Sequence, residues 1–143
     1  SFTGIRIGLS IIKGFNSALG KKLMGATIFE IVKDHVKNGT VLIKSTNTSY
    51  YYGKISNNKV SDFGVIENTK LAELKDKIFI ISEETNNSDL SYIDYETIKN
   101  YPYLVYNYFK TRVEENGFNQ ITEITPFYIQ VSQAERMLKE KND

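Results

Sequence analysis

The sequence predicts an α/β fold in which helices flank a mixed sheet. Apolar residues recur with the helical period of 3.6 in residues 1–20 and 27–38. In residues 40–66 they alternate instead with the period of two that is typical of half-buried strands. Residues 78–81, Ile-Phe-Ile-Ile, form a continuous apolar run, which indicates a strand covered on both faces.

The opening helix, residues 1–20, is too apolar for an ordinary surface helix. On a helical wheel one stripe holds Gly4, Gly8, Ile11, Phe15 and Ala18. This stripe is widened beyond half the circumference by Ile5, Ile7, Leu9, Ile12 and Leu19. A helix so broadly apolar must be covered on two sides. We therefore expect one side to pack on the chain's own sheet and the other on a neighbour or a partner chain.

Three glycines, Gly4, Gly8 and Gly14, lie inside this helix. Each costs roughly 0.5–1 kcal/mol relative to Ala, and close approach of another backbone would explain them. The alternative is an ordinary buried helix of an α/β domain whose glycines fit its own sheet. The spacing leaves both interpretations open.

The second helix begins with a capping box, with Thr27 at the N-cap and Glu30 at N3, and stops at residues 38–39. His35 falls near the end of its apolar face. An isolated histidine there is either a catalytic or metal-binding imidazole or, more simply, a packed or capping side chain. Because the chain has no second His and no Cys, we predict neither a metal site nor a cofactor.

Three strands, residues 40–45, 49–56 and 59–66, follow as a meander with short polar turns. Tyr50, Tyr51 and Tyr52 stand in the middle strand, where alternate rings point to opposite faces. The simpler interpretation is that these tyrosines are half-buried side chains of a sheet. The alternative is that their rings form a platform on which nucleic-acid bases stack.

The second half of the chain continues the α/β pattern. Residues 67–76 predict a short helix, and residues 78–81 the apolar strand. An acidic pair follows in a polar loop, at residues 83–84. Adjacent acidic residues in such a loop are better explained as solvated surface side chains than as an acid–base pair in catalysis. A further helix starts at residues 100–102 and ends at Gly117, and a last amphipathic run opens with a second capping box at residues 132–135. The predicted buried face of the helix that ends at Gly117 comprises Leu104, Val105, Tyr108, Phe109 and Val113.

Composition excludes several function classes. Lys and Arg number 18 against 17 for Asp and Glu, a net charge of +1 that argues against nucleic-acid binding by bulk electrostatics. No apolar run approaches the roughly 18 residues that a membrane span needs, so we expect no membrane partner and a cytoplasmic protein.

Residues 1–8, SFTGIRIG, together with Lys13 and Gly14, resemble the second half of the GPGSFTG-x-R-x-G signature of the TsaB (YeaZ) family. Residues 41–52 are similar to the family's strand–turn–strand, although Lys44, Thr46 and Ser49 stand where Asp, Arg and Glu are usual. Residues 126–130 and 134–135 look like its Pro-x-Tyr-hydrophobic-Arg and Ala-Glu tail, with Gln130 replacing Arg.

The resemblance implies the C-terminal part of an actin-like (ASKHA, RNase H-like) ATPase fold. Residues 1–38 would be the remnant of the amino-terminal lobe, containing the interface helix, a short strand and a helix. Residues 39–143 would form the carboxy-terminal lobe.

It also implies a non-catalytic scaffold that pairs with TsaD, joined by TsaE, for threonylcarbamoyl transfer to tRNA, which it contacts only through the complex. The family's partner surface includes the helix after GPGSFTG, so the interface residues would be Gly4, Arg6, Ile7, Gly8, Ile11 and Phe15, with Arg6 and Lys13 at the rim.

Other functions stay open. Ser1, Thr3 and Gly4, at a helix N-terminus, would be the residues that hold a nucleotide phosphate. An enzyme would be a glycoprotease-type metallopeptidase or an actin-fold ATPase. A direct tRNA-binding module would use Lys21, Lys22 and the tyrosine strand. An exposed apolar first helix would also support a homodimer.

Overall fold

A computed structural model describes residues 2–81 and 90–129. Contacts divide the chain into two compact units, one of Ser1–Gly25 with Phe109–Asp143 and the other of Ala26–Tyr108. The lobe boundary expected after residue 38 falls inside the second of these units. The division into a remnant of the amino-terminal lobe and a carboxy-terminal lobe stays a prediction. The second capping box and the acidic pair lie outside the described residues.

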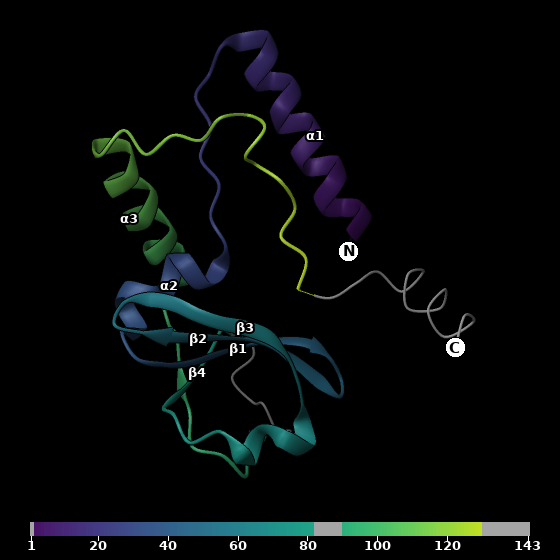
Figure 1. The fold of residues 1–143 in the computed structure, drawn as a ribbon, viewed down its shortest axis with the longest axis vertical. Helices are drawn as coiled ribbons and strands as arrows, with labels where there is room; N and C mark the ends of the chain where they lie inside the picture. The colour runs from purple at the N-terminus through teal and green to yellow at the C-terminus, as the bar shows by residue number, and fades with distance from the viewer. Residues whose placement is uncertain (1, 82–89, 130–143) are drawn as a thin grey trace, which may run out of the picture. The chain divides into compact units, whose positions relative to one another are not determined.

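The second unit contains a five-stranded mixed sheet in the order β3-β2-β1-β4-β5 (Figure 1). Its meander of β1 (Gly39–Thr46), β2 (Ser49–Ser56) and β3 (Lys59–Glu67) is antiparallel, as the alternation predicts. β4 (Ile78–Ile80) pairs in parallel with β1, and β5 (Glu96–Thr97) pairs in parallel with β4. The inner position of β4 explains its continuous apolar run.

The hairpin between β2 and β3 turns at two asparagines. Asn57 and Asn58 have φ of 52° and 59°, the left-handed region that a two-residue type I′ turn requires at both positions. Asparagine tolerates this region better than other residues with a Cβ. The short connection fixes the register in which β2 and β3 pair.

One face of the sheet is covered by α2 (Ile28–Val36), whose side chains Phe29, Val32 and Val36 are buried. Phe29 lies so close to β2 that a Cβ at Gly53 would stand 2.5 Å from its ring. The helix begins with the predicted capping box: the Glu30 N–H donates to Thr27 Oγ1 at 3.2 Å, and the Thr27 N–H donates to the Glu30 carboxylate at 2.7 Å.

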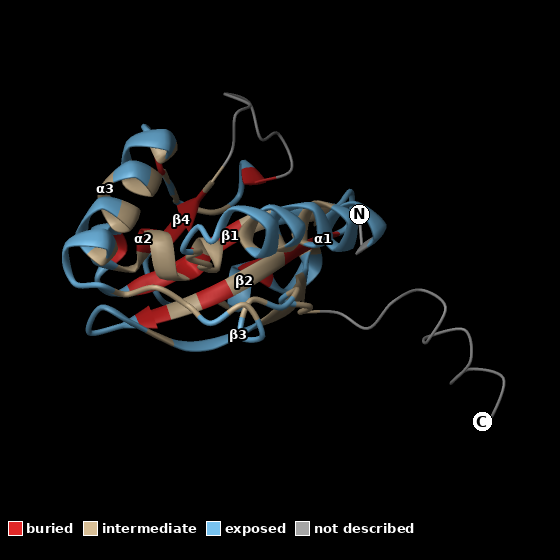
Figure 2. Ribbon diagram, turned by 90° about the horizontal axis from the view of Figure 1, so that it is seen from above, coloured by how far each residue is buried: buried red, intermediate tan, exposed pale blue. Residues whose placement is uncertain are grey.

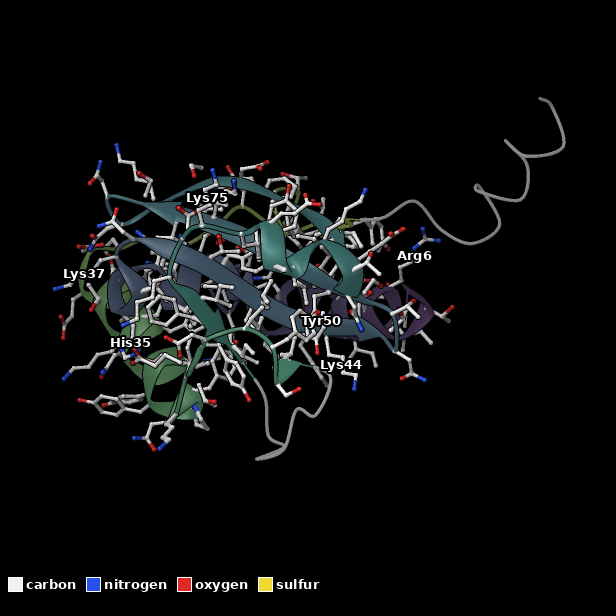
Figure 3. All side chains as sticks on the ribbon, turned by 90° about the horizontal axis from the view of Figure 1, so that it is seen from below. Arg6, His35, Lys37, Lys44, Tyr50 and Lys75 are labelled. Carbon is white, nitrogen blue, oxygen red and sulfur yellow. The ribbon has the colours of Figure 1, made fainter. Side chains whose placement is uncertain are left out.

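The opposite face carries a hydrophobic cluster beneath the 3₁₀ helix η1 (Asn68–Glu73), which replaces the short α-helix expected there. Leu71 of η1 is fully buried in this cluster with Leu42 and Tyr50. In Figure 3 Tyr50 lies among the strands, whereas Lys44 of the neighbouring strand reaches out from the unit. Tyr50 and Tyr52 share this face because strand side chains alternate.

The helices α1 (Phe2–Leu19) and α3 (Tyr101–Glu114) are more exposed than the inner strands β1 and β4 (Figure 2). No side chain from Tyr101 to Glu114 is fully buried, and Val113 is 48% exposed. The prediction that one face of α3 is buried is therefore wrong. The short strand expected between the first two helices is reduced to one antiparallel bridge between Leu23 and Asn119.

Candidate functional site

The helix α1 presents a broad apolar face to solvent. Ile7, Ile11 and Phe15 follow one another at helical spacing, and Ile5, Ile12 and Leu19 continue the same arc. At 100° per residue these six side chains span roughly 160° of the helix. We call them the apolar face of α1. Their exposed fractions are 47% for Ile5, 55% for Ile7, 53% for Ile11, 47% for Ile12, 61% for Phe15 and 63% for Leu19.

The rest of α1 is polar or half-buried. Thr3, Arg6, Ser10 and Ser17 are exposed on the opposite side, and a narrow strip of Leu9, Lys13 and Asn16 is half-buried. No side chain from Thr3 to Leu19 is fully buried. The burial of one whole side that we expected is therefore not observed for these residues.

Two glycines of α1, Gly8 and Gly14, have no packing reason within the described part of the chain. A Cβ at Gly8 or at Gly14 would meet no atom within 4 Å. Gly4 is exposed in the first turn. The interpretation in which these glycines fit the chain's own sheet is thus not supported at Gly8 and Gly14, and Gly8 lies in the middle of the apolar face of α1.

Arg6 contacts the distant Tyr128, which belongs to the same unit. Its Nε–H donates a hydrogen bond of 2.7 Å to the Tyr128 hydroxyl, and its guanidinium stands 5.4 Å from the centre of that ring. Figure 3 shows Arg6 projecting away from the α1 ribbon. On the helical wheel it lies opposite the apolar face, so its contact leaves that face open.

The segment that follows α1 is attached to the same unit by further contacts. The Lys22 ammonium stands 4.6 Å from the centre of the Phe118 ring. The Gly25 N–H donates to Asn119 Oδ1 at 2.9 Å, and Arg112 donates to the carbonyl oxygens of Gly25 and Gly117. These bonds hold the segment after α1 against the end of α3.

The predicted nucleotide-binding residues are only partly described. Thr3 and Gly4 lie exposed in the first turn of α1, and Ser1 lies outside the described residues. The phosphate site at this helix N-terminus stays a prediction.

His35 lies exposed near the end of α2, not packed on its apolar face. It contributes to a small charged group in which Lys77 Nζ and Glu96 Oε2 are 2.6 Å apart. The Lys77 ammonium, and more weakly the His35 imidazole, lower the pKa of the Glu96 carboxyl below its ordinary value. Within residues 2–81 and 90–129, no three His, Cys, Asp or Glu side chains gather as metal ligands.

The tyrosine strand does not form a stacking platform. Tyr50 is buried, and Tyr51 and Tyr52 are half-buried on opposite faces of the sheet. Among the positions that depart from the family pattern, Thr46 and Ser49 bond each other through their hydroxyls at 2.7 Å, Lys44 is exposed, and Gln130 lies outside the described residues.

The fold is similar to a solved one. One matching structure is the crystal structure of an uncharacterized protein with similarity to peptidase YEAZ from Pseudomonas aeruginosa. The chain has a YEAZ-like fold. The TM-score is 0.53 at 13% sequence identity, and the match covers 91% of this chain and 69% of that chain. No protein-family model and no curated protein matches the sequence.

A membrane span is not found either. None of the helices in the described ranges has the combination of length and hydropathy that crossing a bilayer requires.

In this fold, the predicted interface residues Gly4, Ile7, Gly8, Ile11 and Phe15 lie on or beside the apolar face of α1, but the predicted Arg6 lies on the opposite side, where it contacts Tyr128. The prediction missed Ile5, Ile12 and Leu19, which are exposed to the same degree. The helical wheel contained the signal, since these three residues widen the apolar stripe. Whether any of these residues binds a partner stays a prediction.

Proposed function

We propose that this chain is a non-catalytic partner subunit that docks on a second protein through the apolar face of α1. The supporting observation is the exposure of six large apolar side chains on one helix, an arrangement that soluble proteins seldom leave uncovered. The YEAZ-like fold agrees with the TsaB resemblance of residues 1–8. The proposed partner is therefore TsaD, joined by TsaE, in threonylcarbamoyl transfer to tRNA.

We further propose the fold and the indirect contact with tRNA that the resemblance implies. The chain would be the carboxy-terminal portion of an actin-like ATPase fold, and it would act on tRNA only through the complex. Its role would be to hold TsaD in an active arrangement rather than to supply reacting groups.

A pull-down with purified TsaD tests the proposal most directly. Gly8→Leu places a large side chain on the apolar face of α1 where a Cβ meets no atom of this chain, so its fold should be kept. We expect this variant to lose TsaD, because a partner that approaches the helix backbone at Gly8 would clash with the new side chain.

Ser10→Leu is the matched control, because it places the same side chain at an exposed position on the opposite side of α1. It should retain TsaD. If both variants bind TsaD as the wild type does, α1 is not the docking helix. If the wild type itself binds no TsaD, measurements of its mass in solution distinguish a homodimer through α1 from a monomer.

A further inference from the structure

The connection between α2 and β1 has an unusual backbone conformation. Lys37, which follows the last residue of α2, has φ of 61° and ψ of −56°. At such a φ, the region that residues with a Cβ tolerate lies at ψ of roughly +30 to +60°. The observed angles are instead close to those of a γ-turn with positive φ, which is rare and strained. The Asn38 N–H donates to the Val36 C=O at 2.7 Å, the hydrogen bond that closes such a turn.

Both ends of this turn are fixed by packing. Val36 is buried where α2 covers the sheet. Gly39, with which β1 begins, lies so close to the residue before β4 that a Cβ would stand 2.5 Å from the Lys77 carbonyl oxygen. Two residues, Lys37 and Asn38, therefore make the whole connection between the helix and the strand.

The turn between β2 and β3 is hydrogen-bonded to this connection. The Asn58 N–H donates to the Lys37 C=O at 3.0 Å, and the Asn57 N–H donates to Asn38 Oδ1 at 2.9 Å. The side-chain amide of Asn58 donates to Asp34 Oδ1, in α2, at 3.1 Å. These three hydrogen bonds join the tip of the hairpin to the end of the helix.

The bond from Asn58 to Lys37 fixes the angle that is strained. To reach the tolerated region, ψ of Lys37 would have to change by roughly 90–120°, which turns the Lys37 C=O away from the Asn58 N–H. A compensating rotation at Asn38 would leave α2 and β1 in place. The Lys37 side chain is exposed and reaches outward (Figure 3). The contacts with the turn therefore act on the peptide between Lys37 and Asn38.

We infer that the Lys37–Asn38 peptide is a two-position switch, and that hydrogen bonds from the β2–β3 turn hold it in its strained position. A strained backbone conformation persists only where the surrounding structure over-determines it. When the turn is released, the peptide rotates and Lys37 relaxes, so the end of α2 and the tip of the hairpin change together. The inference is independent of the proposed function, because these residues and α1 belong to different units.

A double-mutant cycle on the folding equilibrium constant, measured by urea unfolding, tests the inference. Lys37→Gly removes the strain, because glycine has no Cβ. A variant with both Asn38→Ala and Asn58→Gly, which we call the released variant, lacks two of the three hydrogen bonds from the turn. Glycine keeps the left-handed φ of 59° at position 58, so the turn itself is retained.

Lys37→Gly should raise the folding equilibrium constant of the wild type roughly fivefold, which is the strain relieved less the entropy that glycine loses on folding. In the released variant the gain from Lys37→Gly should be at least about threefold smaller, because Lys37 has already relaxed. Equal gains in the two backgrounds, or no gain in the wild type, would overturn the inference.

Asn100→Gly is the matched control for this cycle. Asn100 also has a positive φ, of 57°, and it is not a partner in the bonds between the turn and α2. The effect of Asn100→Gly should therefore be the same in the wild type and in the released variant. A difference between the backgrounds as large as the one at Lys37 would overturn the inference.

Carbon chemical shifts of the Lys37 backbone report the position of the peptide. After correction for the neighbouring substitution, they should differ between the wild type and the released variant, whereas the shifts of Asn100 should not. Identical Lys37 shifts would mean that the peptide is held without the turn, and the inference would be wrong.

Asn58→Gly alone keeps the test decisive if the released variant does not fold. This variant loses only the bond to Asp34, so we expect smaller changes in the same direction, both in the gain from Lys37→Gly and in the Lys37 shifts. An unchanged gain together with unchanged shifts would then count against the inference.

Discussion

Gly53 of β2 lies directly against Phe29 of α2: a Cβ on Gly53 would stand 2.5 Å from Cδ1 of the ring. Gly53 is buried, and the Phe29 side chain is 1% exposed. The absence of a side chain on the strand thus lets the helix settle on the sheet. This contact packs α2 against the meander.

Gly53→Ala should therefore lower the free energy of unfolding by about 1–3 kcal/mol, because the new methyl group overpacks the ring of Phe29. Urea unfolding measures this change. Gly14→Ala is the matched control, since a Cβ there meets nothing within 4 Å. It should raise the free energy of unfolding by roughly 0.5–1 kcal/mol. Equal effects of the two variants would contradict the packing described here.

Truncation of two phenylalanines on helices should change stability by very different amounts. Phe29→Ala should cost about 3–5 kcal/mol of stability because it leaves a cavity beneath α2. Phe15→Ala, at a side chain that is 61% exposed, should change stability by no more than about 0.5 kcal/mol. Thermal unfolding followed by circular dichroism compares them. A large loss for Phe15→Ala would mean that the apolar face of α1 is covered by its own chain.

The capping box contributes a measurable part of the stability of α2. Thr27→Ala removes the oxygen that accepts from the Glu30 N–H, and we expect a loss of about 1 kcal/mol. Thr111→Ala, at an exposed position within α3, is the control and should be neutral or slightly stabilising. Chemical unfolding of both variants distinguishes loss of the cap from a general effect of removing threonine.

The ion pair of Lys77 with Glu96 predicts a pH dependence of known sign. Because the Lys77 ammonium lowers the pKa of Glu96 below its ordinary value of 4.5, the ionised form is favoured in the folded protein. The stabilising effect of the ion pair is fully present above the pKa that Glu96 has in the unfolded chain. It disappears as the pH falls through the lower pKa that Glu96 has in the folded protein. Both side chains are exposed, so added salt should weaken the effect.

An NMR titration of the Glu96 carboxyl measures this pKa directly. In Lys77→Met the pKa should return towards its ordinary value, and in the wild type the difference should shrink at high salt. A pKa of Glu96 that is unchanged by Lys77→Met would show that the cause lies elsewhere.

Local features of this chain could be predicted from its sequence. The first helix, the capping box at Thr27 and the asparagine turn between β2 and β3 all depend on residues within a few positions of each other. The continuous apolar run of β4 likewise predicted a strand buried on both faces. The α/β class followed from the periodicity of these segments, and the five-stranded mixed sheet agrees with the fold that the resemblance implies.

Other features depended on contacts between distant residues. The bond of Arg6 with Tyr128 joins residues separated by 122 positions, and no local pattern relates them. The three tyrosines of β2 look alike in sequence, yet only Tyr50 is fully buried. It belongs to the cluster with Leu71 of η1 and Leu90, whereas Tyr52 on the same face only packs against the border of that cluster.

For α1, the sequence was enough to predict a helix that is too apolar for one covering surface, since periodicity is a property of neighbouring residues. The arc of that helix that stays uncovered could not be predicted in this way, because exposure depends on what the rest of the chain places beside it. That arc turned out to be wider than the predicted interface, and it includes Ile5, Ile12 and Leu19.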